Sequence, residues 1–398
     1  MTQPQFFPII IVGGGPAGLA TALHLKQRAP ALANDLIIIE AKEYPRPKLC
    51  GGGITIHGEE QLAKLGIKLD VPYFRVDSLR FRLGEQEFVV PHEQAMRVIQ
   101  RSEFDAALAD TARQHDVVIH SNERVREVYP IAEGYEIVTD KATYHTRVLV
   151  ATDGANSLIR RKLKFHSEEG VARLLRVLTP IDPSHPTMAS RSAIFDFSCI
   201  QRGIQGYMWD FPCMVDGVPH MNSGIFDSRI TPKDDSQPHG NLKATFADFL
   251  AQRGVDLDQT PLKGHPVRWF AKSSEFSRPH VLLAGDAAGV DALFAEGISY
   301  AMEYGSIVAD MLIDAFETDD YNFSDYRDRI LAHRMGKLLM RRVWLARTIF
   351  PYHVPPFWWL FWRFAAIAPR WMQQDIGAWM ALLPEKSTLA DDPIAVPN

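Results

Sequence analysis

The sequence predicts an α/β fold in which a doubly wound parallel sheet is joined to an antiparallel-sheet domain and a helical C-terminal region. The first observation is a strand-like apolar run at 9–12 that leads through a glycine-rich turn into a helix-like run at 19–26. The second is the recurrence of apolar strand-like runs that end in turn or acidic residues, at 36–39, 148–151 and 281–284. The third is the alternation of apolar and polar residues between 78 and 90, which is typical of half-buried antiparallel strands.

The turn Gly13-Gly14-Gly15-Pro16-Ala17-Gly18 has the order of strand, glycines and helix that a Rossmann-like dinucleotide-binding domain requires. Without a Cβ, Gly13 can make the tight turn, Gly15 lets a pyrophosphate approach the backbone, and Gly18 lets the helix lie close on the strand. Pro16 opens the helix, where the N–H that it lacks would have no intrahelical partner. We therefore expect dinucleotide phosphates at this helix N-terminus.

The second strand-like run ends at Glu40, 22 residues beyond Gly18, where an acidic side chain is expected to accept from a ribose hydroxyl. A carboxylate at this place would repel a 2′-phosphate. These residues leave open whether the dinucleotide is FAD or NAD.

Two later strand-like runs also end in an Asp and small residues. Asp153-Gly154 follows the first of them, with Ser157, Arg160 and Arg161 beyond, and Gly285-Asp286 follows the second. Glu296-Gly297-Ile298-Ser299 then opens a helix-like pattern that continues to Met311. Ligands of open α/β sheets bind at the carboxyl ends of strands, so these segments are expected to face the same ligand.

Together, the glycine turn, Asp153-Gly154 with Ser157 and Arg160, and Gly285-Asp286 resemble the flavoprotein class of aromatic hydroxylases, halogenases and geranylgeranyl reductases. The segment from Arg101 to Leu108 also resembles this class. The resemblance, which spans residues 9 to 311, implies FAD as the cofactor. It also implies that Asp286 binds the ribityl chain and that Arg101 lies near the flavin phosphates.

Three segments resemble the geranylgeranyl reductase family in particular: Pro45 to Ile54, Tyr207 to Pro212, and Ala284 to Ile298. The resemblance implies that Cys50 and its glycines lie beside the isoalloxazine and that Tyr207 and Trp209 belong to the substrate cavity. The candidate catalytic residues are Cys50, Tyr207 and Trp209, and no metal ligand is predicted. The candidate cofactor-binding residues are Gly13, Gly15, Pro16, Ala17, Gly18, Glu40, Ala41, Lys48, Cys50, Gly51, Gly52, Arg101, Asp153, Gly154, Gly285, Asp286, Gly297 and Ile298.

The chain departs from the family pattern at two places. Ser223-Gly224-Ile225-Phe226 keeps one glycine of a G-x-G, and Ala292 and Ala295 stand where members commonly carry a proline and a glycine. The FAD prediction does not depend on these positions, whereas the identity of the substrate does.

Several of these residues admit a second interpretation. The Cys50 thiol would hold the substrate, tune the redox step or gate the cofactor, or it is a small residue that fits the turn. Tyr207 and Trp209 stand two apart, so on a strand they face one side, toward the flavin or toward the core. His57 is interpreted as a surface histidine at a helix start rather than as a proton donor.

The composition is that of a globular enzyme. Of 398 residues, 46% are hydrophobic and 23% charged, and the formal net charge of −5 argues against nucleic acid as the main partner. Three cysteines without a C-x-x-C pair indicate neither a disulfide framework nor a zinc site. The N-terminus lacks a basic n-region, so no signal peptide is predicted and the expected location is the cytoplasm.

The motifs predict a discontinuous FAD-binding domain over 1–75, 98–165 and 270–315. The substrate domain is expected over 76–97 and 166–269, as an antiparallel sheet laid over the flavin. Residues 316–398 are expected to form a helical region rich in Trp and Arg.

Six of the eight tryptophans fall in this last region, among arginines. They are Trp344, Trp358, Trp359, Trp362, Trp371 and Trp379. The apolar stretch 356–369 is too short for a spanning helix, which needs about 20 residues. Two interpretations stay open: peripheral membrane contact at the cytoplasmic face through 340–380, or packing of the rings on the substrate domain.

We therefore predict an FAD-dependent oxidoreductase that reduces carbon–carbon double bonds of an isoprenoid or other hydrophobic substrate by hydride transfer from reduced flavin. The expected reductant is NAD(P)H or a ferredoxin-like electron-donor protein, and no second glycine fingerprint decides between them. The alternative is a monooxygenase that hydroxylates an aromatic or peptidyl substrate through a flavin hydroperoxide. A third interpretation is a non-catalytic FAD-holding partner of another protein.

Overall fold

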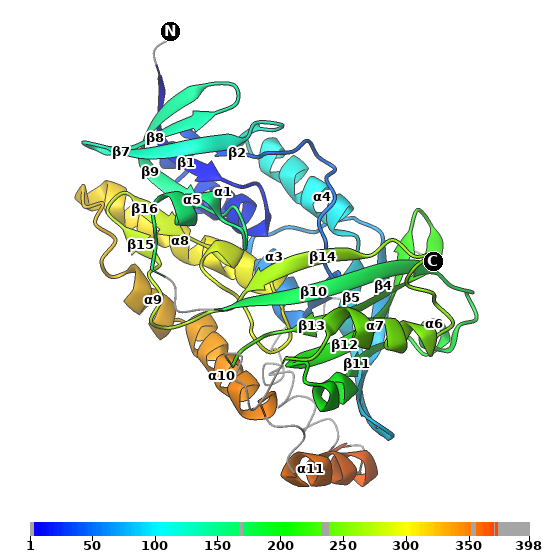
Figure 1. Cartoon of the computed structure of the whole chain (residues 1–398). Coiled ribbons are helices and arrows are strands. Elements are labelled where there is room, and N and C mark those ends of the chain that lie inside the picture. Colours follow the sequence, from blue (N-terminus) through cyan, green and yellow to red (C-terminus); the bar gives the residue numbers. More distant parts are fainter. Residues whose placement is uncertain (1–3, 167–169, 232–238, 352–355, 370, 373–398) are drawn as a thin grey trace.

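The computed structural model describes residues 4–166, 170–231, 239–351, 356–369 and 371–372. Two eight-stranded sheets form the framework of this part of the chain, and helices surround them (Figure 1). The predicted α/β fold, with a Rossmann-type sheet, a second sheet and C-terminal helices, is confirmed.

The first sheet has a parallel centre with the order β16-β9-β1-β2-β6. These strands are β1 (Gln5–Val12), β2 (Leu36–Ile39), β6 (Val118–His120), β9 (Thr143–Ala151) and β16 (Val281–Leu283). Three antiparallel strands extend it. β8 (Gly134–Thr139) pairs with β9, β7 (Val125–Ile131) pairs with β8, and β15 (Ser277–Arg278) pairs with β16. Ile9, Ile10 and Ile11 of β1 have no exposed surface, because both faces of a central parallel strand are covered.

The second sheet has the order β14-β10-β13-β12-β11-β4-β5-β3. Its strands are β3 (Gly53–Thr55), β4 (Tyr73–Leu83), β5 (Gln86–Ile99), β10 (Val171–Pro180), β11 (Ser192–Asp196), β12 (Gly206–Val215), β13 (Val218–Asp227) and β14 (Lys263–Arg268). Every pair in it is antiparallel except β4 and β11, which run parallel. β3 lies within the range predicted for the FAD-binding domain, 1–75, yet it pairs in this second sheet. The domain boundaries stay a prediction.

Helix α1 (Pro16–Arg28) begins at the glycine turn and packs against α8 (Ile298–Thr318). The two helices are closest at Gly305, where an added Cβ would lie 2.6 Å from the backbone nitrogen of Thr21. The remaining helices before α8 are α2 (Pro30–Ala33), α3 (Ile56–Lys64), α4 (Arg101–Gln114), α5 (Leu158–Lys162), α6 (Pro186–Ala189), α7 (Leu242–Ala251) and the 3₁₀ turns η1 (Phe197–Arg202) and η2 (Gly285–Ala287).

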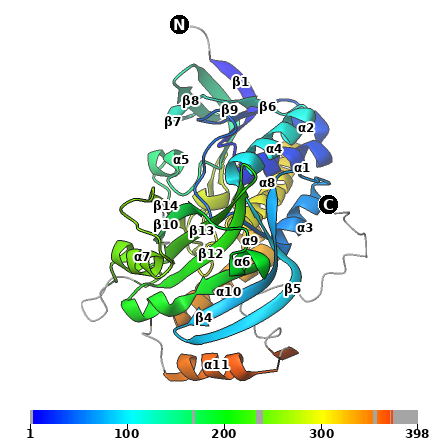
Figure 2. The same ribbon diagram turned by 90° about the vertical axis from the view of Figure 1, so that its right-hand side faces the viewer.

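Three helices follow α8: α9 (Tyr326–Ala332), α10 (Arg334–Ile349) and α11 (Pro356–Ile367). Figure 2 shows α11 at the end of the second sheet, beside β4 and β5. Trp362 is buried there, with its ring centroid 5.1 Å from that of Phe88 and 5.6 Å from that of Phe197. The prediction of membrane contact covers 340–380. Part of this stretch, namely 352–355, 370 and 373–380 with Trp379, lies outside the described residues. None of the helices that the structure describes combines the length and the apolar character needed to cross a membrane.

We expect Gly305→Ala to lower the free energy of unfolding by about 1–3 kcal/mol, because the new methyl group meets the backbone of α1 rather than a movable side chain. Helix propensity alone would favour the alanine by about 1 kcal/mol, so a loss isolates the packing effect. Urea denaturation measures it, with Glu317→Ala, exposed in the same helix, as the control. A stabilised Gly305→Ala protein would contradict the close packing of α1 and α8.

Candidate active site

A cavity of about 1070 Å³ lies where the carboxyl ends of the first sheet meet the second sheet. All the candidate catalytic and cofactor-binding residues from the sequence line it except Gly18 and Gly285. One part of its wall is polar backbone and charged side chains, and another is a group of aromatic rings. The structure thus gathers segments that are as far apart in sequence as Gly13 and Ile298.

The glycines of the turn differ in the space that surrounds them. A Cβ on Gly13 would lie 2.4 Å from the carbonyl oxygen of Thr152, and one on Gly18 would lie 2.2 Å from that of Gly13. A Cβ on Gly15 would meet no atom nearer than a guanidinium nitrogen of Arg46, at 3.8 Å. Gly13 and Gly18 are therefore required by the protein itself, whereas Gly15 leaves free space on the cavity side. This space at a helix N-terminus fits the phosphates of a dinucleotide.

Glu40 is buried beside this turn and holds its shape. Its carboxylate accepts hydrogen bonds from the backbone nitrogens of Gly14 at 2.9 Å and Lys42 at 3.1 Å. Arg46 lies 3.3 Å from Glu40 and 3.3 Å from Asp105, and it donates to the carbonyl oxygen of Gly14 at 3.1 Å. Sequence reasoning missed Arg46 and Asp105 as part of the site.

Arg101 is held in place by the same buried group of charges. It donates two hydrogen bonds to Asp105, at 2.8 and 2.9 Å, as an i, i+4 pair on α4. Buried charges of opposite sign need such partners, and the spacing of Arg101 and Asp105 was a signal for the pair.

Asp153 lines the cavity but also caps a helix. One carboxylate oxygen accepts from the backbone nitrogens of Leu158 at 2.6 Å and Ile159 at 3.2 Å, at the start of α5. Burial raises the pKa of this carboxyl group. Arg160, which the resemblance had grouped with Asp153, is buried and donates to the carbonyl oxygens of Ala287 and His166, at 3.1 and 3.0 Å. It therefore ties the ends of β9 and β16 together.

The turn that carries Cys50 is tethered by the second sheet. The carbonyl oxygen of Cys50 accepts from Asn222 at 3.1 Å and from Arg176 at 3.2 Å, and that of Gly51 accepts from Asn222 at 3.0 Å. Gly52 has φ of +80°, and a Cβ there would lie 2.3 Å from the carbonyl oxygen of Ile99. The turn is thus fixed at the cavity wall. Asn222 and Arg176 carried no motif by which the sequence could have identified them.

Tyr207 and Trp209 face the same side of β12, as their spacing predicted, and that side is the cavity. With Phe195, Phe211 and Phe294 they form what we call the aromatic wall, with neighbouring ring centroids 5.1–6.1 Å apart. The Tyr207 hydroxyl donates to the carbonyl oxygen of Phe294 at 2.6 Å. Burial, with Asp291 nearby, raises the pKa of Tyr207 well above its ordinary value.

Gly224, the glycine that the chain keeps from the family's G-x-G, pairs with Trp209 across β12 and β13. A Cβ at this position would lie 2.0 Å from the Trp209 ring. The glycine is therefore needed to seat the indole in the aromatic wall.

Lys48 enters the cavity beside Asp286. Its ammonium group lies 2.6 Å from Nε2 of His265, which the sequence did not identify. Burial and the Lys48 charge lower the pKa of His265 to about 4, so the imidazole is neutral and accepts from the ammonium group. Burial lowers the pKa of Lys48, and the nearby Asp286 carboxylate opposes this.

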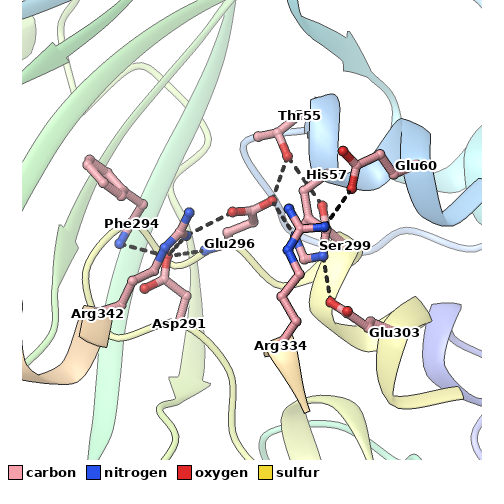
Figure 3. Close-up of polar contacts among 10 residues, drawn as sticks. All are labelled: Thr55, His57, Glu60, Asp291, Phe294, Glu296, Ser299, Glu303, Arg334 and Arg342. Atoms are coloured by element: carbon pink, nitrogen blue, oxygen red, sulfur yellow. Dashed lines mark hydrogen bonds and ion pairs between the residues drawn. The ribbon is translucent and has the colours of Figure 1, made fainter. Parts of the chain in front are cut away.

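A buried ionic cluster holds the turn before α8 (Figure 3). Arg342 of α10 donates to Asp291 at 2.6 Å and to Glu296 at 2.8 Å. Asp291 also accepts from the backbone nitrogens of Leu293 at 2.8 Å and Phe294 at 3.0 Å. Sequence reasoning assigned 316–398 to a separate region and missed that Arg342 fixes one wall of the site.

The interpretation of His57 as a surface residue is wrong. Its side chain is 11% exposed and lines the cavity, because α8 and α10 cover the start of α3. Nε2 lies 2.6 Å from Glu303, and Nδ1 lies 3.8 Å from Glu296. Burial opposes protonation of the ring, but the two carboxylates outweigh it and raise the pKa of His57 to about 9. In the described part of the chain no group of three or more His, Cys, Asp or Glu side chains is placed to hold a metal ion.

Comparison with known proteins identifies the class. A family model described as an FAD binding domain matches residues 7–302, and the chain belongs to this family. The chain is 27% identical over 329 residues to a menaquinone reductase of Mycolicibacterium smegmatis, covering 78% of this chain and 77% of that protein. It is 24% identical over 338 residues to digeranylgeranylglycerophospholipid reductase 2 of Methanosphaera stadtmanae, covering 81% of each.

Two solved structures share the fold. A geranylgeranyl bacteriochlorophyll reductase-like protein of Thermoplasma acidophilum superposes with a TM-score of 0.65 at 19% identity, covering 95% of this chain and 92% of that one. The p-nitrophenol 4-monooxygenase of Pseudomonas putida superposes with a TM-score of 0.65 at 17% identity, covering 96% of both chains. The chain is therefore an FAD-dependent oxidoreductase, as its motifs predicted, and it is similar to enzymes named as a menaquinone reductase and a digeranylgeranylglycerophospholipid reductase.

We expect Gly15→Ala to fold with the stability of the wild-type apoprotein and to bind FAD at least about tenfold more weakly. The new methyl group makes only an ordinary contact with a guanidinium nitrogen of Arg46, at 3.8 Å, but it enters the space expected for the phosphates. Fluorescence titration with FAD and thermal unfolding of the apoprotein measure the two effects. Gly18→Ala is the matched comparison, since its Cβ overlaps the protein and should lower the stability. Wild-type FAD affinity in Gly15→Ala would contradict this placement of the phosphates.

The raised pKa of His57 predicts a stability contribution that depends on pH. Unfolded histidine titrates near 6.5, so the contribution is complete below that pH and is lost as the pH rises through about 9. Wild type should therefore be more stable to unfolding than His57→Gln at low pH. This difference in the free energy of unfolding should shrink by at most about 3 kcal/mol as the pH rises from 6.5 through about 9. Urea denaturation at pH 6 and pH 9.5 measures it. His145→Gln, which breaks a half-buried His–Glu pair at 3.1 Å outside the cavity, is the control. An unchanged difference would mean that His57 is not protonated in the folded protein.

Proposed function

We propose that this protein reduces carbon–carbon double bonds of an isoprenoid or a similarly hydrophobic substrate. The observation that carries the proposal is the composition of the cavity, in which the FAD-binding segments and the aromatic wall line one continuous space. A cofactor site with an apolar extension suits a water-poor reaction on an apolar group. The names of the relatives, a menaquinone reductase and a digeranylgeranylglycerophospholipid reductase, support a hydrophobic substrate.

In this proposal the protein holds the cofactor and the substrate in place, and FAD, when bound and reduced, supplies the hydride. Glu40, Gly15 and Arg101 hold the nucleotide end, and Lys48, Asp286 and the turn at Cys50 flank the flavin. The tether from Asn222 fixes this turn, so that Cys50 presents its half-buried side chain to the cavity. The thiol then sets the distance between the turn and the substrate.

Tyr207 and Trp209 act as walls rather than as acids. The Tyr207 proton is engaged by the carbonyl oxygen of Phe294, and its raised pKa keeps the phenol neutral. The Trp209 indole donates to Asn222 at 3.3 Å, which links the aromatic wall to the Cys50 turn. Their rings exclude water from the place where the double bond is expected.

The test is anaerobic turnover followed by mass analysis of the product. The purified protein is reduced with dithionite and mixed with a geranylgeranyl lipid, with and without air. We expect a product heavier by two hydrogens for each reduced double bond, formed without oxygen. An oxygenated product formed only in air, with no reduced alkene, would contradict the reductase and favour the monooxygenase. Repeating the reaction with NAD(P)H, or with a reduced ferredoxin-like protein, in place of dithionite then identifies the electron donor.

We further propose that the outer face of α11 contacts the cytoplasmic face of a membrane, from which a lipid substrate enters. Trp362 and Ala365 turn inward and are buried, whereas the side chains opposite them are exposed. The exposed ones are Trp359, Leu360, Phe364 and Ile367, between 44% and 83% exposed, with Trp371 beyond the helix at 61%. Aromatic rings suit the headgroup level of a bilayer, and Arg363 beside them suits anionic lipid.

We expect Trp359→Ser with Phe364→Ser to weaken binding to vesicles of phosphatidylcholine and phosphatidylglycerol by at least about tenfold, since each ring would bury about 150–250 Å². Vesicle cosedimentation measures this. Val118→Ser with Tyr129→Ser, two side chains 48% exposed on β6 and β7, is the matched control. Equal binding of both double variants would contradict the membrane role of α11.

A further inference from the structure

A set of titratable side chains runs from the cavity wall to a partly exposed histidine at the start of α10. Figure 3 shows its inner members, His57, Glu296 and Glu303. His57 and Glu296 line the cavity. Glu303 lies behind His57 and is 3% exposed, and His333, at the start of α10, is 38% exposed. None of these side chains has a role in holding the cofactor or the substrate in the function proposed above.

The distances make this set continuous. His57 Nε2 lies 2.6 Å from one oxygen of Glu303, and the other oxygen of Glu303 lies 3.6 Å from Nδ1 of His333. Glu303 therefore joins the buried imidazole to the place where the cluster reaches solvent. Nδ1 of His333 accepts from the backbone nitrogen of Met335 at 3.2 Å, so the proton that Glu303 takes up comes from the solvent at this place and not from that nitrogen. A carboxylate with one oxygen on His57 and the other toward the surface can take up a proton on one side and release it on the other.

Other groups on this wall are poorly suited to give up a proton. Glu296 accepts from Arg342 at 2.8 Å and from the Thr55 hydroxyl at 2.6 Å, and these partners, with His57, hold its pKa well below its ordinary value despite its burial. Arg342 stays protonated, because its guanidinium is buried against Asp291 and Glu296. The Tyr207 proton is engaged by Phe294. Burial raises the pKa of Tyr300, which also lines the cavity, well above its ordinary value, so this phenol holds its proton. Of these groups, His57 therefore gives up a proton most readily.

We propose, on the basis of the function proposed above, that His57 donates the proton that completes reduction of the double bond and that Glu303 returns a proton to it from the solvent beside His333. One alkene carbon receives the hydride that reduced FAD supplies, and the other receives the proton of His57. The π bond breaks, two C–H bonds form, and FAD is left oxidised by two electrons. The proton that His57 gives up comes from Nδ1, because Nε2 is held by Glu303. The neutral imidazole then turns its deprotonated nitrogen toward Glu303, which delivers a proton taken from solvent, so one solvent proton is consumed in each cycle.

The pH dependence of this step reflects all the charged groups that face His57. They come from α3, from α8 and the turn before it, and from α10: Glu60 and Lys64, Glu296, Tyr300 and Glu303, and His333, Arg334 and Arg342. The carboxylates at 296 and 303 dominate, and they raise the pKa of His57 to about 9. Turnover should therefore be level near neutral pH and fall as His57 loses its proton.

The experiment compares wild type, His57→Gln, Glu303→Gln and the control His145→Gln as FAD-loaded proteins. Two readouts are needed: the rate of anaerobic reduction of a geranylgeranyl lipid between pH 6 and pH 10, and the His57 titration seen by NMR of protein labelled with ¹⁵N-histidine. We expect His57→Gln to lower the rate at least about a hundredfold and to lose the alkaline decline. Glu303→Gln should lower the NMR pKa of His57 by at least about one unit and move the decline in rate with it. His145→Gln should match wild type in both.

Three results would overturn the inference: a wild-type rate in His57→Gln, an alkaline decline that survives in it, or a His57 that titrates near the ordinary histidine value in wild type. Failure of the proposed function looks different. In that case neither wild type nor any of the variants reduces the alkene at any pH, and the proton-donor role of His57 fails together with the proposed function.

Discussion

The structure depends on backbone lying directly against backbone at the carboxyl end of the parallel sheet. Gly13 meets Thr152, Gly18 meets Gly13, and Gly305 meets Thr21, each at a distance that leaves no room for a Cβ. These contacts bring β1, β9, α1 and α8 together at one place. Gly15, in the same turn, has no such contact with backbone and leaves a free space toward the cavity. The packing that the protein needs thus creates the place where the phosphates fit.

Buried charges then fix the walls around this space. Arg46 joins Glu40 to Asp105 on the nucleotide side, and Arg342 joins Asp291 to Glu296 on the opposite side. Removing one partner from such a group leaves an unpaired buried charge, which costs about 3–5 kcal/mol. Both groups therefore hold the turns that line the cavity in a defined geometry. They also set the charge that surrounds His57 and Lys48, and hence which of the cavity's groups are protonated.

The sequence was sufficient for those features that are encoded locally. The glycine turn, the strand that ends at Glu40 and the strand ends at Asp153 and Asp286 follow from periodicity and from residues that special turns require. Resemblance added the flavin and the wall formed by Tyr207 and Trp209.

The features that were missed depend on contacts between distant segments. The parallel pairing of β4 with β11 joins residues more than one hundred positions apart. Arg342 reaches Asp291 from a helix that composition alone suggested to be separate, and Asn222 of β13 reaches Cys50 across 172 positions of sequence. His57 was misplaced for the same reason, since its own neighbours give no sign that α8 and α10 bury it. Which amphipathic faces meet is decided by the whole chain and not by a local pattern.

The central claim is that one cavity holds the flavin and a hydrophobic alkene side by side. A crystal structure of the protein with FAD and a geranylgeranyl lipid tests it most directly. The expected result is an isoalloxazine ring between the Cys50 turn and the turn at Gly297, with a double bond of the lipid between that ring and the aromatic wall. Lipid bound only at the outer face of α11, with the aromatic wall packed against itself, would contradict the claim.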